Sequence, residues 1–499
     1  MIFTGRENAS ILFTQKKLIR FILLGGIVTN ELYELLNLVD NSVSYEEGKV
    51  SIKDSSIIRT KIHNWVRVSI MDEGSLQGWA RYLIRLTAQE LGIFPASIHE
   101  LYMANGRGAL EQKFTVPAIN LRVLSFNAAK AAFNAANSIE AGALIFEIAR
   151  SEIGYTAQQP VEFASNILAA AIATGYHGPV FIQGDHYQVS AKRFEEDPKK
   201  ELDKIEDLIQ QSILAGFFNI DVDTSTLVDI SKHDINDQQE LNFDLSAHFT
   251  DVIRRKEPDG ITVSVGGEIG EVGGRNSTVE ELNAYLNGYN RRLNDKYSSF
   301  TGLSKVSIQT GTSHGGIVLA DGSIAKVKVD FDTLRDLSRV VREKFGLGGT
   351  VQHGASTLPD DAFGKFVEYE AIEVHLATNF MNMFYDNGPK GLISKMYQYL
   401  DENFQSNRQP DMTDEQFYYK TRKYAIGPFK KDINLLDEDF KSHMEYLLYM
   451  KFRDLFQSLN VHGTKDLVDE LIPKVSTPLK LEDYVGSVVE QEDVSDLAD

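Results

Sequence analysis

The sequence predicts an α/β protein built on a TIM (β/α)8 barrel, with additional, mainly helical regions before and after it. Eight short β-rich runs alternate with helical stretches between about residues 115 and 378. Eight β/α units over about 265 residues match the usual size of this barrel, which is ~250 residues. Several of the helical stretches also end in glycine, as helix C-termini commonly do. A doubly wound open sheet alternates in the same way, but usually with fewer strands.

The eight predicted strands are short apolar runs. In order they are TVPAINLRV (from Thr115), ALIFEIA (from Ala143), PVFIQGD (from Pro179), FFNIDVD (from Phe217), ITVSVGG (from Ile261), KVSIQTG (from Lys305), GTVQHGA (from Gly349) and AIEVHLAT (from Ala371). Stretches between them, such as EFASNILAAAIATG, repeat apolar residues at the helical period. We therefore expect the barrel to occupy residues 111–390.

Residues 1–110 lack this alternation and predict a helical N-terminal extension. KKLIRFILLGGIVTNELYELLNLVD and GWARYLIRLTAQELGI both space their apolar residues near the helical period. Both tryptophans, Trp65 and Trp79, fall in this region, so we expect a helical cap with a small core of its own. A helix that lies on a membrane surface is the alternative.

Residues 391–499 predict a helical C-terminal extension, because the strands stop there. SKMYQYLDENF, EQFYYKTRKYAI and HMEYLLYMKFRDLFQSL are helical patterns joined by polar connections. The chain ends in the acidic tail VVEQEDVSDLAD, which we expect to be frayed.

Composition excludes several classes of function. The formal net charge of −20 argues against nucleic-acid binding, since a phosphate backbone is bound by clustered lysine and arginine. No stretch approaches the roughly 20 apolar residues needed to span a bilayer, and no secretory signal is evident, so we expect a cytoplasmic protein with no membrane partner. The chain has no cysteine, so a transition metal would be held by histidine and carboxylate side chains.

Three histidines each stand at the end of a predicted strand and close to glycine. They are His186 in VFIQGDH, His314 in VSIQTGTSHGG and His353 in TVQHGAS. Strand ends of an α/β barrel converge on one mouth, where active sites lie. Three neutral imidazoles there would form an open metal site with a position left for water or substrate. We predict a Zn²⁺ site, with Co²⁺, Mn²⁺ and Fe²⁺ as competitors; histidines that pack in the core or cap helices are the alternative.

With the strands laid out, the motifs resemble those of the class II, metal-dependent fructose- and tagatose-bisphosphate aldolases. The resemblance covers roughly residues 100–390 and implies a divergent member with long terminal extensions. The motifs that carry it are Asp185–His186, GEIGEVGG with Glu268, GTSHG at Gly311–Gly315 and HGAST at His353–Thr357. It implies that His186, His314 and His353 bind the metal, and that a ketose bisphosphate is cleaved reversibly through a metal-stabilised enediolate.

The resemblance also implies roles for residues around the metal. Asp185 matches a carboxylate that polarises the aldehyde or moves the hydroxyl proton; orienting a metal-bound histidine is the alternative. Glu268 matches a carboxylate near the metal, either a catalytic group or an alternative or second-metal ligand, and an ordinary strand-end hydrogen-bond acceptor is its alternative. The residues in matching places for substrate or phosphate contact are Asn120, Gly315, Gly354, Ser356 and Thr378. For Ser356 and Thr378 the alternative is capping of a helix N-terminus.

The chain departs from the family pattern where the substrate would be handled. After the eighth strand the family has Asn-x-Asp-Thr, whereas this chain has HLAT, so His375 and Ala377 replace the Asn and the Asp. Arg275 follows paired glycines where aldolases commonly place acidic residues. Arg275 and His375 could recognise a phosphate or a sugar-acid carboxylate, or be solvated loop residues. The basic run Lys420–Lys431 is weakly similar to an aldolase segment that meets the far phosphate; a basic surface helix is the alternative.

The leading hypothesis from the sequence is therefore a zinc-dependent aldolase of carbohydrate metabolism that acts on a phosphorylated sugar or a related carbonyl substrate. A metal-dependent sugar or sugar-acid epimerase or isomerase on the same barrel is the first alternative, since it also begins by stabilising charge beside a carbonyl. A non-catalytic barrel module is the second. The resemblance also implies a homo-oligomer.

Overall fold

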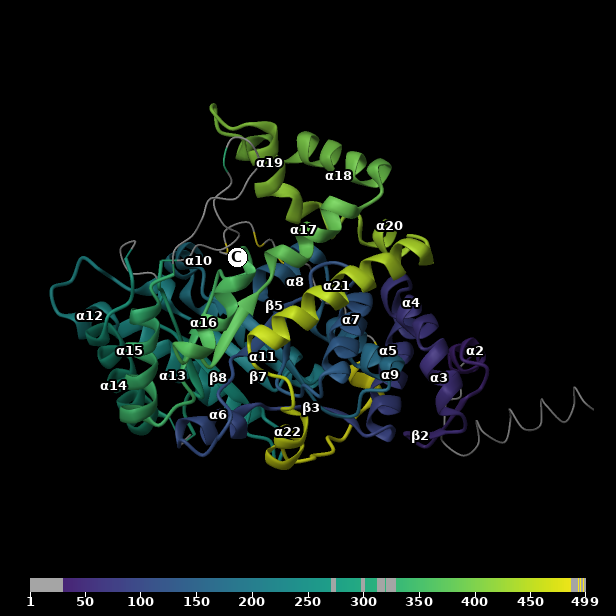
Figure 1. Ribbon diagram of the computed structural model, residues 1–499, viewed down its shortest axis with the longest axis horizontal. Coiled ribbons are helices and arrows are strands. Elements are labelled where there is room, and N and C mark those ends of the chain that lie inside the picture. Colours follow the sequence, from purple (N-terminus) through teal and green to yellow (C-terminus); the bar gives the residue numbers. More distant parts are fainter. Residues whose placement is uncertain are drawn as a thin grey trace, which may run out of the picture.

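A closed barrel of eight parallel strands forms the centre of the protein (Figure 1). The computed structural model describes residues 30–270, 275–297, 301–311, 319, 329–485, 492, 494 and 497. Each barrel strand pairs with the next, and the last pairs with the first, which closes the ring. The strands are β4 (Val116–Asn120), β5 (Ile145–Ala149), β6 (Gly178–Gln188), β7 (Asn219–Asp223), β8 (Ser264–Glu268), β9 (Lys305–Ile308), β10 (Thr350–Gln352) and β11 (Glu373–Leu376). The predicted TIM-barrel fold class is confirmed.

The barrel strands are buried on both faces, which accounts for their apolar sequences. Every residue of β5 and of β7 is buried, as expected for parallel strands with side chains packed inside the barrel and helices outside. The register also aligns the strand ends. Ala149 at the end of β5 pairs with Asp185 of β6, so side chains near the carboxyl ends of the strands meet at one mouth.

Helices cover the outside of the barrel and alternate with the strands along the chain. The longer ones are α7 (Ser125–Ser138), α9 (Pro160–Thr174), α11 (Pro198–Ala215), α13 (Glu240–Lys256), α14 (Val279–Lys296) and α15 (Phe331–Phe345); the shorter ones are α8 (Arg150–Thr156), α10 (Ala191–Glu196), α12 (Ile235–Gln238), α16 (Phe363–Glu368) and α17 (Thr378–Asn387). Helices α9, α11 and α15 end at the left-handed residues Gly175, Gly216 and Gly346. These glycine endings of the sequence are therefore helix C-caps.

The N-terminal extension is mainly helical, as predicted, and also contains three short strands. Its helices are α2 (Asn30–Leu38), α3 (Ser55–Lys61), α4 (His63–Met71), α5 (Gly74–Glu90) and α6 (His99–Gly106). Strands β1 (Val43–Glu46) and β2 (Lys49–Ile52) form a hairpin, and β3 (Ile93–Ala96) pairs with the beginning of β6. These strands were not predicted, because the sequence around them shows no alternation of strand and helix patterns. Pro95 also makes β3 atypical, and it lies at the edge of the sheet, where proline is tolerated.

The two tryptophans do not form a separate core. Trp65 and Trp79 are 0% and 3% exposed and belong to one continuous apolar core with the barrel strands, so this expectation was wrong. Helix α5 packs against α9 of the barrel, and Arg81 pairs with Glu162 across that contact at 3.0 Å. Among the described residues, no helix is both long enough and apolar enough to cross a membrane.

The C-terminal extension is helical and partly covers the barrel mouth (Figure 1). Its helices are α18 (Lys390–Asn403), α19 (Asp414–Thr421), α20 (Lys430–Asn434), α21 (Glu438–Ser458) and α22 (Lys465–Leu471), and its short 3₁₀ turns include η4 (Arg422–Ala425). Together with α17, helices α18 to α20 enclose an apolar core that includes Met396, Phe417 and Ile433. We call this unit the C-terminal cap. The domain boundaries at residues 110 and 390 stay predictions.

The described part of the acidic tail is docked rather than frayed. Glu492 pairs with Arg150 at 2.6 Å and with Arg193 at 2.5 Å. Val494 and Leu497 form a small apolar cluster with Tyr155 of α8. Ion pairs and apolar contacts that could not be foreseen from the tail's composition therefore hold these positions against the barrel.

Candidate metal centre and substrate pocket

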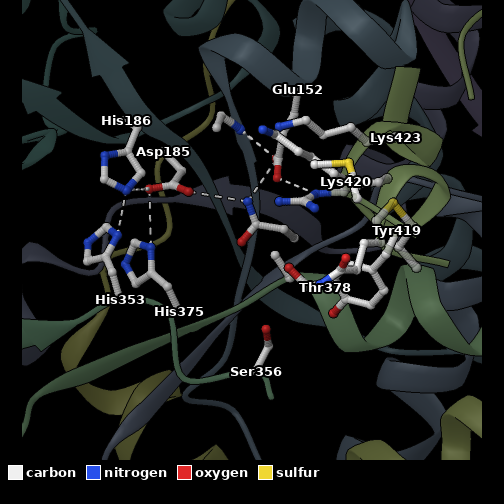
Figure 2. Close-up of a pocket in the computed structure, with 18 of the residues that line it drawn as sticks. Glu152, Asp185, His186, His353, Ser356, His375, Thr378, Tyr419, Lys420 and Lys423 are labelled. Carbon is white, nitrogen blue, oxygen red and sulfur yellow. Dashed lines mark hydrogen bonds and ion pairs between the residues drawn. The ribbon is translucent and has the colours of Figure 1, made fainter. Parts of the chain in front are cut away.

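A pocket of about 800 Å³ opens at the carboxyl ends of the barrel strands. Two parts of the chain line it. The strand ends and the segments after them supply Asn120, Arg122, Ala149, Glu152, Asp185, His186, His353, Gly354, Ser356, His375, Ala377, Thr378 and Met381. The C-terminal cap supplies Gln409, Pro410, Asp411, Met412, Gln416, Tyr419, Lys420 and Lys423. Figure 2 shows the labelled histidines on one side of this space and Tyr419, Lys420 and Lys423 on the other.

A bulge in β6 brings two consecutive side chains, Asp185 and His186, to the pocket. Side chains of a regular strand alternate between its faces, but the β6–β7 register shifts between Gly184 and Tyr187. His186 takes a left-handed φ of 41°. The ring of Tyr187 fills the space beside Gly184, where an added Cβ would lie 2.4 Å from Tyr187 Cζ. The bulge therefore depends on the absence of a side chain at Gly184.

His186 and His353 face each other at the inner end of the pocket. His186 Nε2 lies 2.5 Å from His353 Nδ1. His353 Nε2 lies 2.9 Å from Ser307 Oγ, and His186 Nδ1 lies 3.3 Å from a carboxylate oxygen of Asp223 and from one of Glu268. Each ring thus turns one nitrogen toward the other ring and the second toward an orienting group, an arrangement typical of histidines that bind metals.

The residues at this inner end fit a transition metal. Ligand atoms of Asp185, His186 and His353 all lie within 4.8 Å of one another. Imidazole nitrogen and carboxylate oxygen are donors that Zn²⁺ prefers when thiolates are absent. Two of the three predicted histidine ligands are therefore brought together, whereas His314 and its neighbour Gly315 lie outside the described residues.

Two carboxylates lie behind His186. Burial and the neighbouring charge of Asp223 raise the pKa of Glu268 to about 8. Burial also opposes ionisation of Asp223, but hydrogen bonds from His186, Gln188 and Ser225 lower the pKa of Asp223. Asp223 was not among the predicted site residues, although it ends the strand run FFNIDVD. Its place at a strand end was the signal that could have identified it.

His375 lies beside the candidate metal ligands and is surrounded by carboxylates. Its ring stacks on that of His353, with centroids 4.1 Å apart. His375 Nδ1 lies 3.2 Å from Glu147 Oε1 and 3.2 Å from Asp185 Oδ1, and its Nε2 lies 2.6 Å from Glu373 Oε1. Burial alone would lower the pKa of His375, but these carboxylates raise it well above its usual value. His375 is therefore buried and paired, unlike the solvated loop residue of the alternative prediction.

Asn120 reaches the same carboxylate from β4. Its Nδ2 donates to Asp185 Oδ2 at 3.2 Å and to Glu152 Oε2 at 2.8 Å. Glu152 also accepts from Arg122 Nε at 2.6 Å. Asn120 was predicted to contact substrate, and it lines the pocket next to Asp185. Arg122 and Glu152 were not predicted, although each follows one of two consecutive strands whose ends lie side by side in a barrel.

The predicted phosphate contacts that fall within the described residues, Gly354, Ser356 and Thr378, all line the pocket. Gly354 has a left-handed φ of 66°, and Thr378 is the first residue of α17, after Ala377 at the N-cap. Neither Ser356 nor Thr378 caps a described helix, so that alternative is wrong. A helix N-terminus at the pocket favours an anion there.

The remaining predicted residues divide between the pocket and the surface. Of the basic run, Lys420 and Lys423 line the pocket, whereas Lys430 pairs with Glu162 at 2.6 Å. Arg275 has a side chain that is 61% exposed and pairs with Glu281 at 2.9 Å. Arg275 is not among the described residues that line the pocket, so its predicted contact with substrate stays a prediction.

Comparisons with known proteins agree with the resemblance in the motifs. A family model described as fructose-bisphosphate aldolase class-II matches residues 105–447. A putative fructose-1,6-bisphosphate aldolase from Coccidioides immitis is 16% identical, over 74% of this chain and 97% of that chain, with a TM-score of 0.43. Fructose-bisphosphate aldolase from Campylobacter jejuni gives the same values.

A second kind of protein is also similar in structure. The fructuronate-tagaturonate epimerase UxaE from Cohnella laeviribosi is 12% identical, over 92% of this chain and all of that chain, with a TM-score of 0.46. The family assignment rests on the family model, which spans more than half of the chain and includes every barrel strand. The protein belongs to the class II fructose-bisphosphate aldolase family.

Proposed function

We propose that the protein is a metal-dependent aldolase that reversibly cleaves a phosphorylated ketose at the carbon–carbon bond beta to its carbonyl, through an enediolate. The convergence of Asp185, His186 and His353 at the inner end of the pocket carries this proposal. The family consists of zinc-using enzymes that act on phosphorylated sugars, and this donor set is compatible with that chemistry.

His186 and His353 would hold the metal, with His314 as the predicted third ligand. A bound Zn²⁺ would act as a Lewis acid that stabilises negative charge on the substrate's carbonyl and adjacent hydroxyl. Asp223 and Glu268 would orient His186 through its Nδ1, and Ser307 would orient His353 through its Nε2. Ring orientation at this end is thus set by strands β7, β8 and β9.

Asp185 is the carboxylate best placed to handle a proton at the substrate's hydroxyl or aldehyde oxygen. It lines the pocket beside both histidines, and its two oxygens lie near His375 and Asn120. A carboxylate held from two sides has a fixed orientation toward the substrate, which is a requirement for efficient proton transfer.

The rest of the pocket suits an elongated anionic substrate. Gly354 and the beginning of α17 at Thr378 would bind the phosphate near the carbonyl. Lys420 and Lys423 would meet a second anionic group at the outer side, since they lie across the pocket from the histidines (Figure 2).

A substrate panel tests the proposal. Protein loaded separately with Zn²⁺, Co²⁺, Mn²⁺ and Fe²⁺ is incubated with ketose mono- and bisphosphates of different stereochemistry, and triose products are trapped enzymatically. We expect cleavage of at least one substrate, and condensation of dihydroxyacetone phosphate with an aldehyde in reverse. Absence of both reactions with every metal form would contradict the proposal.

Epimerisation or isomerisation of a sugar or sugar acid is the second candidate, and one observation favours it. His375 places an imidazole, flanked by carboxylates, where the family pattern has the amide of Asn. An imidazole can carry a proton, whereas an amide cannot. Incubation in D₂O distinguishes the reactions: deuterium in an epimer without any triose product identifies this candidate.

A further inference from the structure

A group of charged side chains lies inside the barrel, beneath the candidate metal centre. Barrel interiors are usually filled by branched apolar side chains, and buried charges are costly unless each is paired. Glu147, Lys305 and Glu373 are each 0% exposed and Asp221 is 6% exposed. The proposed reaction uses none of these four charged groups, so it does not by itself explain why they are buried.

Lys305 is the centre of this group. It is the first residue of β9, and its ammonium pairs with Glu373 and lies 2.9 Å from Asp221 Oδ2. It also donates to Gln183 Oε1 at 2.8 Å. Four strands of the barrel, β6, β7, β9 and β11, are therefore tied together by one buried cation.

Glu373 links Lys305 to His375, which lines the pocket. It accepts hydrogen bonds from Tyr102 Oη and from Gln183 Nε2, the latter at 3.0 Å. Its Oε1 lies 2.6 Å from His375 Nε2. Glu373 is thus held by Lys305, Tyr102 and Gln183, and it fixes one nitrogen of the His375 ring.

The second nitrogen of His375 connects the group to the reacting end. His375 Nδ1 lies 3.2 Å from Asp185 Oδ1, and Asn120 binds the other oxygen of Asp185. The Asp185 carboxylate is therefore restrained from two sides, by an ion-pair contact with His375 of β11 and by a hydrogen bond from Asn120 of β4. Both ring nitrogens of His375 thus face carboxylates of the protein, and one of these carboxylates, Asp185, lines the pocket with His375.

We propose that Lys305 and Glu373 are positioning residues, which fix the ring of His375 and, through it, the orientation of the Asp185 carboxylate at the candidate metal centre. The catalytic part of this inference rests on the proposed function, whereas the orientation of Asp185 can be measured without it. A displacement of about 1 Å in a reacting group can lower the rate by about 100-fold, so the arrangement would act on turnover rather than on substrate binding.

Two variants remove the contacts that hold His375 in place. Both are designed to leave as little unpaired charge as possible inside the barrel. Lys305→Met with Asp221→Asn removes the ammonium together with one of its carboxylate partners. Glu373→Gln keeps the shape of the side chain and removes its charge. Arg81→Met is the matched control, because Arg81 is also a buried cation, paired with Glu162 at 3.0 Å, and it does not line the pocket.

Crystal structures of the zinc-loaded proteins and steady-state kinetics provide the readouts. We expect the Asp185 carboxylate to rotate in both variants, and kcat to fall at least 10-fold while KM and zinc content stay within twofold of wild type. Arg81→Met should lower only the melting temperature. If Asp185 keeps its orientation, or if kcat per folded, metal-loaded molecule is unchanged, the inference is wrong and the group has a purely structural role.

The crystal structures and the kinetics together distinguish a failure of this inference from a failure of the proposed function. Should the wild-type protein cleave no ketose phosphate, the crystallographic comparison still decides whether Lys305 and Glu373 position Asp185. If the double variant does not fold, Glu373→Gln provides the same test with a smaller change.

Discussion

The two ends of the pocket are built in different ways. The inner end consists of strand-end residues such as Asp185, His186 and His353, which are 4% to 7% exposed and contact one another. The outer end consists of side chains from short helices of the C-terminal cap, such as the exposed Lys420 on α19. A closed barrel fixes groups to within small displacements, whereas a cap with its own apolar core can change with little effect on the barrel. Under the proposed function, the reacting groups would therefore lie on the barrel, and the contacts with the far end of the substrate on the C-terminal cap.

The substitution with the largest expected effect is His353→Ala, at the inner end of the pocket. Removal of one of the predicted ligands should abolish stoichiometric zinc binding and lower kcat/KM by at least about 1,000-fold, or about 4 kcal/mol. Elemental analysis and the aldolase assay measure the two quantities. His248→Ala is the control, because His248 pairs with Glu206 outside the pocket. A variant that keeps its zinc would show that His353 is not a ligand.

A buried histidine distant from both ends should affect stability instead. His99 bonds to Ser304 at 2.7 Å, and burial, together with Arg254 and Arg107, lowers its pKa to about 4. The unfolded chain, in which the pKa is about 6.5, therefore binds more protons between these values. The free energy of unfolding should fall by up to about 3 kcal/mol as the pH falls from 6.5 to 4.

Urea unfolding of wild type and of His99→Gln measures this contribution as the difference between their pH dependences. Zinc content at pH 7 serves as the control and should be equal in the two proteins. An identical pH dependence would contradict the assignment of this loss to His99.

A smaller effect is expected at the outer end. Lys420→Met and Lys423→Met should each raise KM for a phosphorylated substrate by roughly fivefold, about 1 kcal/mol, because single charge interactions that are open to water are weak. The effect should diminish at high salt, and kcat should change less than twofold. Lys431→Met is the control, since Lys431 pairs with Glu73 and does not line the pocket. A large fall in kcat would show that the two ends are not separable.

The smallest effect is expected for Arg275→Ala. Its guanidinium is largely exposed and pairs with Glu281, so kcat/KM should stay within twofold of wild type. A rise in KM of tenfold or more would instead support the contact between Arg275 and the substrate that the sequence predicts, and would assign part of the substrate recognition to a residue outside the cap.

Strand-end motifs were predictable from the sequence because they are local. Asp185–His186 and HGAST stand at the ends of apolar runs, so both the fold and the inner end of the pocket followed from them. Contacts across the barrel were not predictable in this way. Lys305 looks like an ordinary polar residue at the start of a strand, and only closure of the barrel brings it to Asp221 and Glu373. The same applies to Lys420 and Lys423, which reach the pocket through packing of the cap.

Gly184 illustrates how a residue without a side chain can matter as much as one that reacts. Its missing Cβ leaves room for the ring of Tyr187, and this allows β6 to bulge and present both Asp185 and His186. In a saturation-mutagenesis survey, Gly184 would tolerate almost no replacement and would be mistaken for a residue that contacts substrate. The path of the backbone at this one position thus limits which side chains β6 can present at the pocket.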